Sequence, residues 1–567
     1  ANASSFARVL PVHSVGDGVT ASWMRRIVSA ALADVGDVCD PIPAHLIARH
    51  GLMSFARALR EVHFPTSLES AEQARRRLAY DELLTLQLAL LTRQDVGHAG
   101  ILPYTHVTDG PHAQAMYAAL PFALTDEQQE AVRDILADMG SERIMNRLLL
   151  GDVGTGKTAV ALVAVAAVAD TGTQAAFMAP TSVLARQYAS NLGHILDAAG
   201  VSWALVTGST PAGERLAIAQ RVADGEVCCV FGTTALLSDD MAFAHLSLVV
   251  VDEQHRFGVN QRRALRQKGA AADSLTMSAT PIPRTLALSL YGDLSCSRIR
   301  NRPVPGAGIT TKVVPPESLD LAYGAIKDAV AAGHQAYVIC PLVDEQDDGS
   351  ELDDVPDREK SGAKKLHAAT TTVKDLAHTV LRGMSLDVVT GRMTGEQKDA
   401  AMERFGNGST DVLVSTTVVE VGVDVPNATV MLVFDADRFG LATLHQLRGR
   451  VGRGKDAGMV YLECAAKPGS PARKRLSALE ATSDGFELAE LDLKLRHEGE
   501  VLGYRQHGGV SLRVCDLNAD ADLVEAAHDE ARQIADEDPR LEHPLHACLA
   551  QECVERYGAY FEEVERA

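Results

Sequence analysis

No apolar run in this chain approaches the ~20 residues that a helix needs to cross a bilayer. The N-terminus lacks the basic region followed by an apolar core that marks a secretory signal. None of the nine cysteines stands in Cys-x-x-Cys spacing, so no structural zinc site is expected. Cys228 and Cys229 lie inside an apolar run, which is more typical of a strand than of metal ligands. These absences predict a reduced cytoplasmic protein.

Positive charge is also in the minority. The chain holds 54 Lys and Arg against 75 Asp and Glu, for a net charge of -21. This balance argues against a nonspecific nucleic-acid binder, although local patches and not totals set the field at a groove. Any DNA contact is therefore expected on a restricted basic track. At 567 residues the chain is too long for one core, and we expect roughly three to five domains.

The most informative segment that is present covers residues 151–158, which read Gly-Asp-Val-Gly-Thr-Gly-Lys-Thr. A predicted strand at 148–150 enters it and a predicted Ala/Val-rich helix at 158–168 leaves it, the order that a phosphate-binding loop requires. Lys157 would reach the β- and γ-phosphates and Thr158 would hold Mg²⁺, so ATP and Mg²⁺ are the expected cofactors. The glycines that let the backbone wrap close to a polyphosphate are Gly151, Gly154 and Gly156. The alternative is an ordinary glycine-rich turn.

Two acids, Asp252 and Glu253, end an apolar run at residues 246–251. In a nucleotide-hydrolysing site, Asp252 would hold Mg²⁺ and Glu253 would orient and deprotonate the attacking water. An acid pair at a strand end is common on protein surfaces. Its position about a hundred residues after a phosphate loop favours the catalytic interpretation.

An arginine-rich motif occupies residues 446–453, Gln-Leu-Arg-Gly-Arg-Val-Gly-Arg. Arg450 and Arg453 are predicted to cross a cleft and neutralise charge on the γ-phosphoryl group, a contact worth on the order of 10³–10⁵ in rate. Hydrolysis would then depend on closure of two lobes. The alternative is a solvated helix face.

The periodicity of the chain changes near residue 122. Residues 1–121 are predicted to be mostly helical, whereas short apolar runs then alternate with helical patterns, which is typical of a parallel sheet. A Pro/Gly-rich linker at 302–308 separates two such regions. The expected strands are 175–179, 227–231, 246–251 and 275–278 before it, and 335–340, 386–390, 411–415, 429–434 and 458–464 after it.

These patterns predict an α/β protein with two lobes and helical additions. A polar, acidic segment at 344–360 is expected to be a flexible insertion in the second lobe. The predicted divisions are a helical segment at 1–121, a first lobe at 122–308, a second lobe at 309–467, a helical hairpin at 468–513 and an acidic helical tail at 514–567.

The clearest helix of the N-terminal segment is predicted at residues 72–91. Ser70 and Gln73 have capping-box spacing at its start. The arginines at 75–77 could touch a phosphate backbone, but a solvated helix face is the favoured interpretation.

As an ordered series, the motifs resemble those of superfamily 2 helicases and, within them, of the RecG family of branched-DNA translocases. Residues 484–490 and 499–506 resemble the helical hairpin and hook of that family, and residues 11–93 resemble its segment between wedge domain and motor. The resemblance implies two tandem RecA-like lobes. The remaining motifs that carry it are Thr125-Asp-Glu-Gln128, Ala179-Pro-Thr181, Thr207-Gly-Ser209, Gly232-Thr233, Asp252-Glu-Gln-His255-Arg-Phe-Gly258, Met277-Ser-Ala-Thr-Pro-Ile-Pro-Arg284, Ser415-Thr-Thr-Val-Val-Glu-Val-Gly-Val-Asp424 and the arginine motif at 446–453.

The resemblance also assigns roles. Gln128 would read adenine, since a side-chain amide can both donate and accept, and Gln446 would belong to the nucleotide site. Phe122 would stack on the base or belong to the core. The residues expected to contact the sugar-phosphate backbone are Thr181, Arg186, Thr207, Ser209, Thr233, Thr416 and Thr417. Those expected to couple ATP hydrolysis to DNA movement are Ser278, Thr280, Arg475 and Gln506.

Several positions depart from the family pattern. Thr234 and Thr390 stand where His is usual, which weakens those DNA contacts and not the ATPase. Residues 496–499 read Arg-His-Glu-Gly in place of Arg-Gly-Pro-Gly, so the turn of the hairpin is expected to differ. Residues 1–10 could not supply a wedge domain, and we expect a motor without one.

The favoured function is an ATP-dependent helicase and double-stranded DNA translocase that remodels replication forks and Holliday junctions in recombination and repair. The resemblance implies a bacterial, nucleoid-associated monomer that binds branched and double-stranded DNA, with single-stranded DNA-binding protein as a family-level partner and no membrane. The alternatives are a transcription-repair coupling translocase, a non-hydrolysing nucleotide-switched scaffold, and a small-molecule kinase, which one phosphate loop supports poorly.

Overall fold

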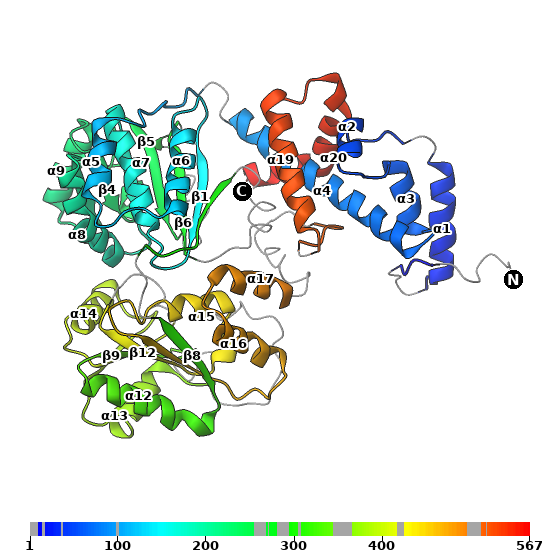
Figure 1. Ribbon diagram of the computed structural model, residues 1–567. Helices are drawn as coiled ribbons and strands as arrows, with labels where there is room; N and C mark the ends of the chain where they lie inside the picture. Colours follow the sequence, from blue (N-terminus) through cyan, green and yellow to red (C-terminus); the bar gives the residue numbers. More distant parts are fainter. Residues whose placement is uncertain are drawn as a thin grey trace. The chain divides into compact units, whose positions relative to one another are not determined.

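The computed structural model describes residues 9–13, 18–35, 38–97, 101–253, 268–269, 271–279, 294–303, 308–343, 366–416, 425–495, 512–517 and 519–566. Within them the chain forms two compact units. One draws on the described parts of residues 1–100 and 512–567, and the other on the described parts of residues 101–282 and 295–495. The larger unit contains two parallel sheets flanked by helices, so the predicted α/β fold of two tandem lobes is confirmed (Figure 1).

The first sheet has the strand order β3-β4-β2-β5-β6-β1-β7, with every pairing parallel. Its strands are β1 (Asn146–Gly151), β2 (Gln174–Met178), β3 (Trp203–Val206), β4 (Cys229–Gly232), β5 (Leu246–Asp252), β6 (Asp273–Ser278) and β7 (Ser295–Ile299). Successive apolar side chains of the strands point to opposite faces of the sheet, and each face packs in a hydrophobic core. This is expected for a parallel sheet that is buried on both sides.

Helices cover both faces of this sheet. One face packs on α5 (Pro111–Ala119), α6 (Asp126–Met139), α7 (Lys157–Thr171) and α8 (Ser182–Ala198). The other packs on α9 (Ala212–Ala223). Because α5 packs on α7 and α8, the segment predicted as one helical block at 1–121 is divided between the two units.

The second sheet has the order β10-β11-β9-β12-β13-β8 and is also parallel throughout. Its strands are β8 (Ile309–Val314), β9 (Gln335–Ile339), β10 (Leu386–Val389), β11 (Val412–Ser415), β12 (Ala428–Val433) and β13 (Gly458–Glu463). One face packs on α12 (Leu319–Ala331) and α13 (Ala369–His378), and the other on α14 (Gly395–Gly406), α15 (Leu441–Arg448), α16 (Pro471–Ala481) and α17 (Gly485–Leu495).

Every expected strand has a counterpart, but three strands were missed: β3, β7 and β8. All three lie at the edges of their sheets. An edge strand is buried less completely than a central one, so its sequence need not be a continuous apolar run. The strand β7, for example, reads Ser-Cys-Ser-Arg-Ile, and the pattern of apolar runs did not predict it. The acidic segment predicted as an insertion, at 344–360, lies outside the described residues.

The smaller unit is helical. Its central helix is α4 (Leu68–Gly97), which packs against α3 (Phe55–His63), α19 (Ala521–Glu537) and α20 (Ala547–Arg566). The other helices of its described part are α1 (Ala21–Asp34) and α2 (Ala44–Arg49). The acidic tail therefore packs on the N-terminal segment and does not stand apart from it.

The predicted start of α4 was wrong. The helix begins at Leu68, and Ser67, not Ser70, caps it: the amide of Ser70 donates to the Ser67 hydroxyl at 3.0 Å, and the Ser67 amide donates to the Ser70 hydroxyl at 3.0 Å. A serine in the cap position and a second three residues later form this reciprocal pair without the glutamine that the sequence pattern favoured.

The arginines at 75–77 form neither a solvated face nor a phosphate track. Arg75 donates to the buried Asp520 at 2.7 Å, and Arg76 pairs with Asp522. Arg77 is fully buried and lies 2.5 Å from Asp40 and 3.1 Å from Asp81. Partners more than 400 residues away in sequence could not be read from local spacing.

Asp81 lies at the centre of this buried cluster, with 1% of its surface exposed. Burial raises the pKa of Asp81 to about 7, although the charge of Arg77 opposes the shift. The folded state therefore holds a proton that the unfolded chain releases near pH 4. The resulting stabilisation is present below that pH and is lost as the pH rises through about 7.

We expect Asp81→Asn to remove this pH dependence, since an amide keeps the shape without the charge. Between pH 5 and pH 8 the unfolding free energy of the parent should fall by about 2–3 kcal/mol more than that of the variant. Denaturant titrations at the two pH values measure this difference. Parallel curves for the two proteins would show that Asp81 is ionised throughout.

Candidate nucleotide site

The loop at residues 151–158 follows β1 and leads into α7, as the sequence predicted. Gly154 and Gly156 have positive φ values of 82° and 78°, which favour glycine. A Cβ on Gly156 would also lie 2.4 Å from the Nε2 atom of Gln128. The Lys157 ammonium donates to the carbonyls of Gly151 at 2.6 Å and Asp152 at 3.1 Å, so the lysine lies folded over the loop.

Two acids stand at the carboxyl end of β5, the strand at the centre of the sheet. Asp252 is buried, and burial together with the charge of Glu253 raises the pKa of Asp252 to about 6. Glu253 has a positive φ of 53° and accepts a hydrogen bond from the Ala279 amide at 3.3 Å. This left-handed turn carries the Glu253 carboxylate toward the end of β6.

A tyrosine that the sequence analysis did not select also contacts this acid pair. The Tyr188 hydroxyl donates to Oδ2 of Asp252, and burial raises the pKa of Tyr188 well above its usual value. The ring of Tyr188 packs edge-on against Phe177, 5.1 Å between centroids. The hydroxyl therefore reaches Asp252 from α8 while the ring belongs to the core.

A pocket of about 190 Å³ is lined by all five predicted catalytic residues. Lys157 and Thr158 line it from the loop, and Asp252 and Glu253 line it from the end of β5. Arg450 and Arg453, from the segment after α15, line it as well. The other lining residues are Val153, Gly154, Leu184, Gln187, Tyr188, Met277 and Ala279.

The alternative of a solvated arginine helix is therefore wrong. The helix of the motif, α15, is buried at Gln446, Leu447 and Arg448, and it ends before Arg450. Arg453 donates to the carbonyl of Gly449 at 2.7 Å, which directs its side chain back along the turn. Both arginines face a pocket that holds two carboxylates and a lysine.

The donor chemistry of the pocket fits a magnesium nucleotide. Thr158 and Asp252 offer a hydroxyl and a carboxylate, the oxygen ligands that Mg²⁺ prefers. Lys157 and the amino end of α7 offer positive charge to phosphates. Burial lowers the pKa of Lys157, and the charges of Glu253 and Asp252 oppose that shift.

Gln128 is fully buried, so the alternative of a helix-surface residue is wrong. Its Oε1 accepts from the Thr125 amide at 2.8 Å as part of a capping box, and its Nε2 donates to the Thr155 carbonyl at 2.7 Å. Phe122 lies beside the loop, with its ring 3.6 Å from a Cβ built on Gly156. Its ring also packs on the core of the first lobe.

Comparison with known families agrees with this arrangement. The DEAD/DEAH box helicase model matches residues 125–288, and the helicase conserved C-terminal domain model matches residues 329–455. A third model, ATP-dependent DNA helicase RecG, domain 3, C-terminal, matches residues 482–557. The ATP-dependent DNA helicase RecG of Mycobacterium leprae is 42% identical over 546 residues, covering 92% of this chain and 72% of the relative.

The chain belongs to the RecG family. The RecG of Bacillus subtilis is 39% identical over 96% of this chain and 77% of its own length, and that of Synechocystis is 39% identical over 97% and 64%. This RecG-family chain thus spans about two thirds to three quarters of the relatives it matches. A solved structure of RecG bound to a three-way DNA junction matches with a TM-score of 0.66 at 36% identity, over 91% of this chain and 66% of that one.

Three of the predicted DNA-contact residues lie together in this RecG-family chain. The Arg186 guanidinium donates to the Ser209 hydroxyl at 3.2 Å, and the Thr207 and Ser209 hydroxyls lie 3.0 Å apart. Arg186 also forms an ion pair with Asp399 of α14. Thr181 caps α8 through its hydroxyl, so Thr181, Arg186 and Tyr188 belong to one helix and its cap.

The remaining predicted contacts are dispersed. Thr233 accepts from the Ala235 amide at 3.4 Å at the end of β4, and Thr416 is buried at the end of β11. Ser278 is buried at the end of β6. Arg475 lies on α16 and donates to the carbonyl of Asp437 at 3.3 Å. Thr280, Thr417 and Gln506 lie outside the described residues.

Sequence spacing also missed a polar chain that reaches the phosphate loop. His445 Nε2 lies 2.8 Å from Asp152, and Arg448 Nη2 lies 2.7 Å from His445 Nδ1. Burial acts to raise the pKa of Asp152, but the hydrogen bond to His445 and the accompanying charge lower it overall. Arg448 donates onward to the carbonyls of Thr482 at 2.7 Å and Ser483 at 3.1 Å, between α16 and α17. The loop is thus connected to the turn between α16 and α17.

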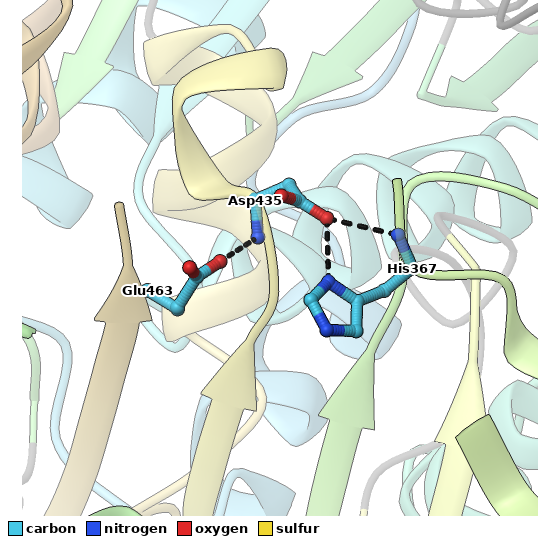
Figure 2. Close-up of side chains that lie close together, drawn as sticks. All are labelled: His367, Asp435 and Glu463. Atoms are coloured by element: carbon cyan, nitrogen blue, oxygen red, sulfur yellow. Dashed lines mark hydrogen bonds and ion pairs between the residues drawn. The ribbon is translucent and has the colours of Figure 1, made fainter. Parts of the chain in front are cut away.

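Among the described residues, one cluster has donor atoms spaced as in metal sites: His367, Asp435 and Glu463, within 4.8 Å of one another (Figure 2). His367 Nδ1 lies 2.7 Å from Oδ2 of Asp435, and the Asp435 amide donates to Glu463 at 2.7 Å. Asp435 has a positive φ of 46°. These bonds stabilise the turn after β12.

In the described part of the chain, no helix is long and apolar enough to cross a membrane.

We expect Tyr188→Phe to weaken divalent-cation binding about tenfold, because a hydrogen bond to a charged group contributes about 1.5 kcal/mol or more. The variant keeps the aromatic packing on Phe177 and removes only the hydroxyl that orients Asp252. Titration with Mn²⁺ in the presence of ADP, followed by electron paramagnetic resonance, measures the change. Tyr117→Phe, at a half-exposed tyrosine, is the matched control. Equal affinities for the two variants would exclude an orienting role.

Proposed function

We propose that this RecG-family chain is an ATP-driven DNA motor that translocates on duplex DNA and remodels branched structures such as forks and Holliday junctions. The observation that carries the proposal is the pocket that Lys157, Asp252 and Glu253 share with Arg450 and Arg453. In a pocket of this kind, ATP hydrolysis depends on how closely the two lobes approach each other. The reason is that the arginines of the second lobe complete the site of the first.

The roles of the pocket residues follow from their chemistry. Lys157 would bind the β- and γ-phosphates, and Thr158 and Asp252 would hold Mg²⁺, which neutralises phosphate charge when bound. Glu253 would orient the attacking water and accept its proton. Arg450 and Arg453 would stabilise the charge that develops on the γ-phosphoryl group. Gln128 and Gln446 complete the proposed nucleotide site, and an adenine contact by Gln128 would compete with its bond to Thr155.

A DNA track is proposed along Thr181, Arg186, Thr207, Ser209 and Thr233 in the first lobe, with Thr416 and Thr417 in the second. Hydroxyls and arginines of this kind position a strand by its phosphates without reading sequence. The relative solved with a three-way DNA junction supports a branched substrate. Because α8 carries Arg186 near one end and places Tyr188 against Asp252, DNA contact and cation site share one rigid element.

Coupling to DNA movement is proposed through Ser278, Thr280, Arg475 and Gln506, and through the chain from Asp152 to Ser483. The corresponding motor lobes would span residues 122–308 and 309–467, with the hairpin at 468–513. We also propose a monomer that acts at the bacterial nucleoid, with single-stranded DNA-binding protein as a partner.

ATP turnover measured against single-stranded, duplex, forked and four-way DNA tests the proposal. We expect duplex and branched DNA to stimulate turnover, and Lys157→Ala to abolish it while leaving DNA affinity largely intact, since Lys157 contacts phosphates of ATP and not of DNA. DNA affinity should fall steeply with salt, because backbone contacts release counterions. A near-zero rate that no DNA changes would favour a nucleotide-switched scaffold instead.

Arg453→Ala should slow hydrolysis at least about a hundredfold while ATP binding stays close to normal, since the arginine is proposed to act in the transition state. Single-turnover hydrolysis and equilibrium binding of a fluorescent ATP analogue separate the two effects. Arg382→Ala, at an exposed arginine of the same lobe, is the control. Loss of nucleotide affinity equal to the loss of rate would make Arg453 a binding residue.

A further inference from the structure

Two cysteines from opposite ends of the chain meet in the helical unit. The Sγ atoms of Cys39 and Cys548 lie 2.8 Å apart, although 509 positions separate the residues in sequence. Cys39 is exposed and Cys548 is partly exposed. A thiol pair at this distance needs a movement of less than about 1 Å to reach the length of a disulfide bond.

The backbone beside Cys39 is fixed by its neighbour Asp40. One carboxylate oxygen of Asp40 accepts from the Ile42 amide at 3.1 Å, and the other accepts from the Phe55 amide at 2.8 Å. Arg77 of α4, which is fully buried, donates to the same carboxylate at 2.5 Å. Asp40 thereby ties the segment before α2 to the central helix of the unit.

Cys548 is fixed by contacts between its own helix, α20, and α4. It lies in the first turn of α20, directly after a turn in which His546 Nδ1 lies 2.8 Å from Asp538. Further along α20, the Cys553 thiol donates to the Thr85 carbonyl at 3.5 Å and the Tyr557 hydroxyl donates to the Glu82 carbonyl at 3.4 Å. Both acceptors belong to α4, so α4 holds both cysteines in place independently of any bond between them.

We propose that Cys39 and Cys548 are a site of covalent modification at which a peroxide forms an intramolecular disulfide between the N-terminal segment and α20. The Cys39 thiolate attacks one peroxide oxygen, the O–O bond breaks, and Cys39 becomes a sulfenic acid with release of water. The Cys548 thiolate then attacks the Cys39 sulfur and displaces the sulfenic oxygen as a second water. Two thiols lose two electrons and two protons, and the peroxide is reduced to two waters.

Exposure favours Cys39, the one exposed cysteine of the nine, and proximity selects Cys548 as its partner. Cys229, Cys340, Cys464 and Cys553 are buried, and burial raises the pKa of each of these thiols, which keeps them protonated. The proton that Cys39 shares with Cys548 also raises the pKa of Cys39. The first step is therefore expected to be slow near neutrality, and the second fast because the partner thiol is already in place.

The test uses the full chain, reduced and then treated with hydrogen peroxide at pH 8. We expect the free-thiol count to fall by two from nine, and peptide mass spectrometry without reductant to show the Cys39 peptide joined to the Cys548 peptide. The monomer band should migrate faster on a non-reducing denaturing gel, because the bond closes a loop of nearly the whole chain. Dithiothreitol should reverse each change.

Matched variants decide between this site and general oxidation. Cys39→Ser and Cys548→Ser should each lose the fast-migrating band, whereas Cys296→Ser, at another partly exposed cysteine, should keep it. Cys39→Ala repeats the test with a different replacement and guards against a folding defect peculiar to serine. The proposal is overturned if the parent yields only intermolecular dimers, or a sulfinic acid at Cys39 with Cys548 unmodified. An unchanged band pattern in Cys39→Ser would overturn it equally.

Discussion

The structure of the larger unit depends on the electrostatic balance of one pocket. Asp252 is buried beside Glu253, and burial together with the charge of Glu253 raises the pKa of Asp252. Lys157 supplies one cation from the phosphate loop, and Arg450 and Arg453 supply two from the other lobe. The same charges that lie beside the acids are the ones that would face the phosphates of the proposed magnesium nucleotide.

Two structural connections lead from that pocket to other parts of the larger unit. Helix α8, which Thr181 caps, carries Arg186 and places the Tyr188 hydroxyl on Asp252. The chain of polar contacts from Asp152 through His445 and Arg448 ends on the carbonyls between α16 and α17. Each of these two connections consists of a few packed groups in direct contact. A change at the pocket can therefore reach the other end of each connection through neighbouring groups alone. The candidate nucleotide site is thus linked to α8 of the first lobe and to the turn between α16 and α17.

The helical unit depends on a different interaction, the burial of Arg77 on α4. Its guanidinium holds Asp40 and Asp81, while Arg75 and Arg76 hold acids of the C-terminal tail. An acidic tail that looked featureless in the sequence therefore pairs with two arginines of the N-terminal segment, Arg75 and Arg76. The two ends of the chain fold as one body, which is also what brings Cys39 to Cys548.

Much of the nucleotide site could be predicted from local order, because the phosphate loop, the acid pair and the buried strands depend on neighbours in sequence. Lys157, Thr158, Asp252 and Glu253 were placed by the strand and helix patterns on either side of them. Their roles, and those of the predicted DNA contacts, remain predictions. Edge strands such as β7 were missed since they have no continuous apolar run.

What the sequence by itself determined is the alternation of strands and helices, since burial on both faces of a parallel sheet imposes a pattern that repeats along the chain. Tertiary structure alone decided which polar groups meet. Tyr188 finds Asp252, His445 finds Asp152, and Arg75 finds Asp520 across separations of 64, 293 and 445 residues. Such pairs arise because a charge or hydroxyl that folding buries needs a hydrogen-bond partner. That partner comes from whichever segment packs beside the buried group, however distant it is in sequence.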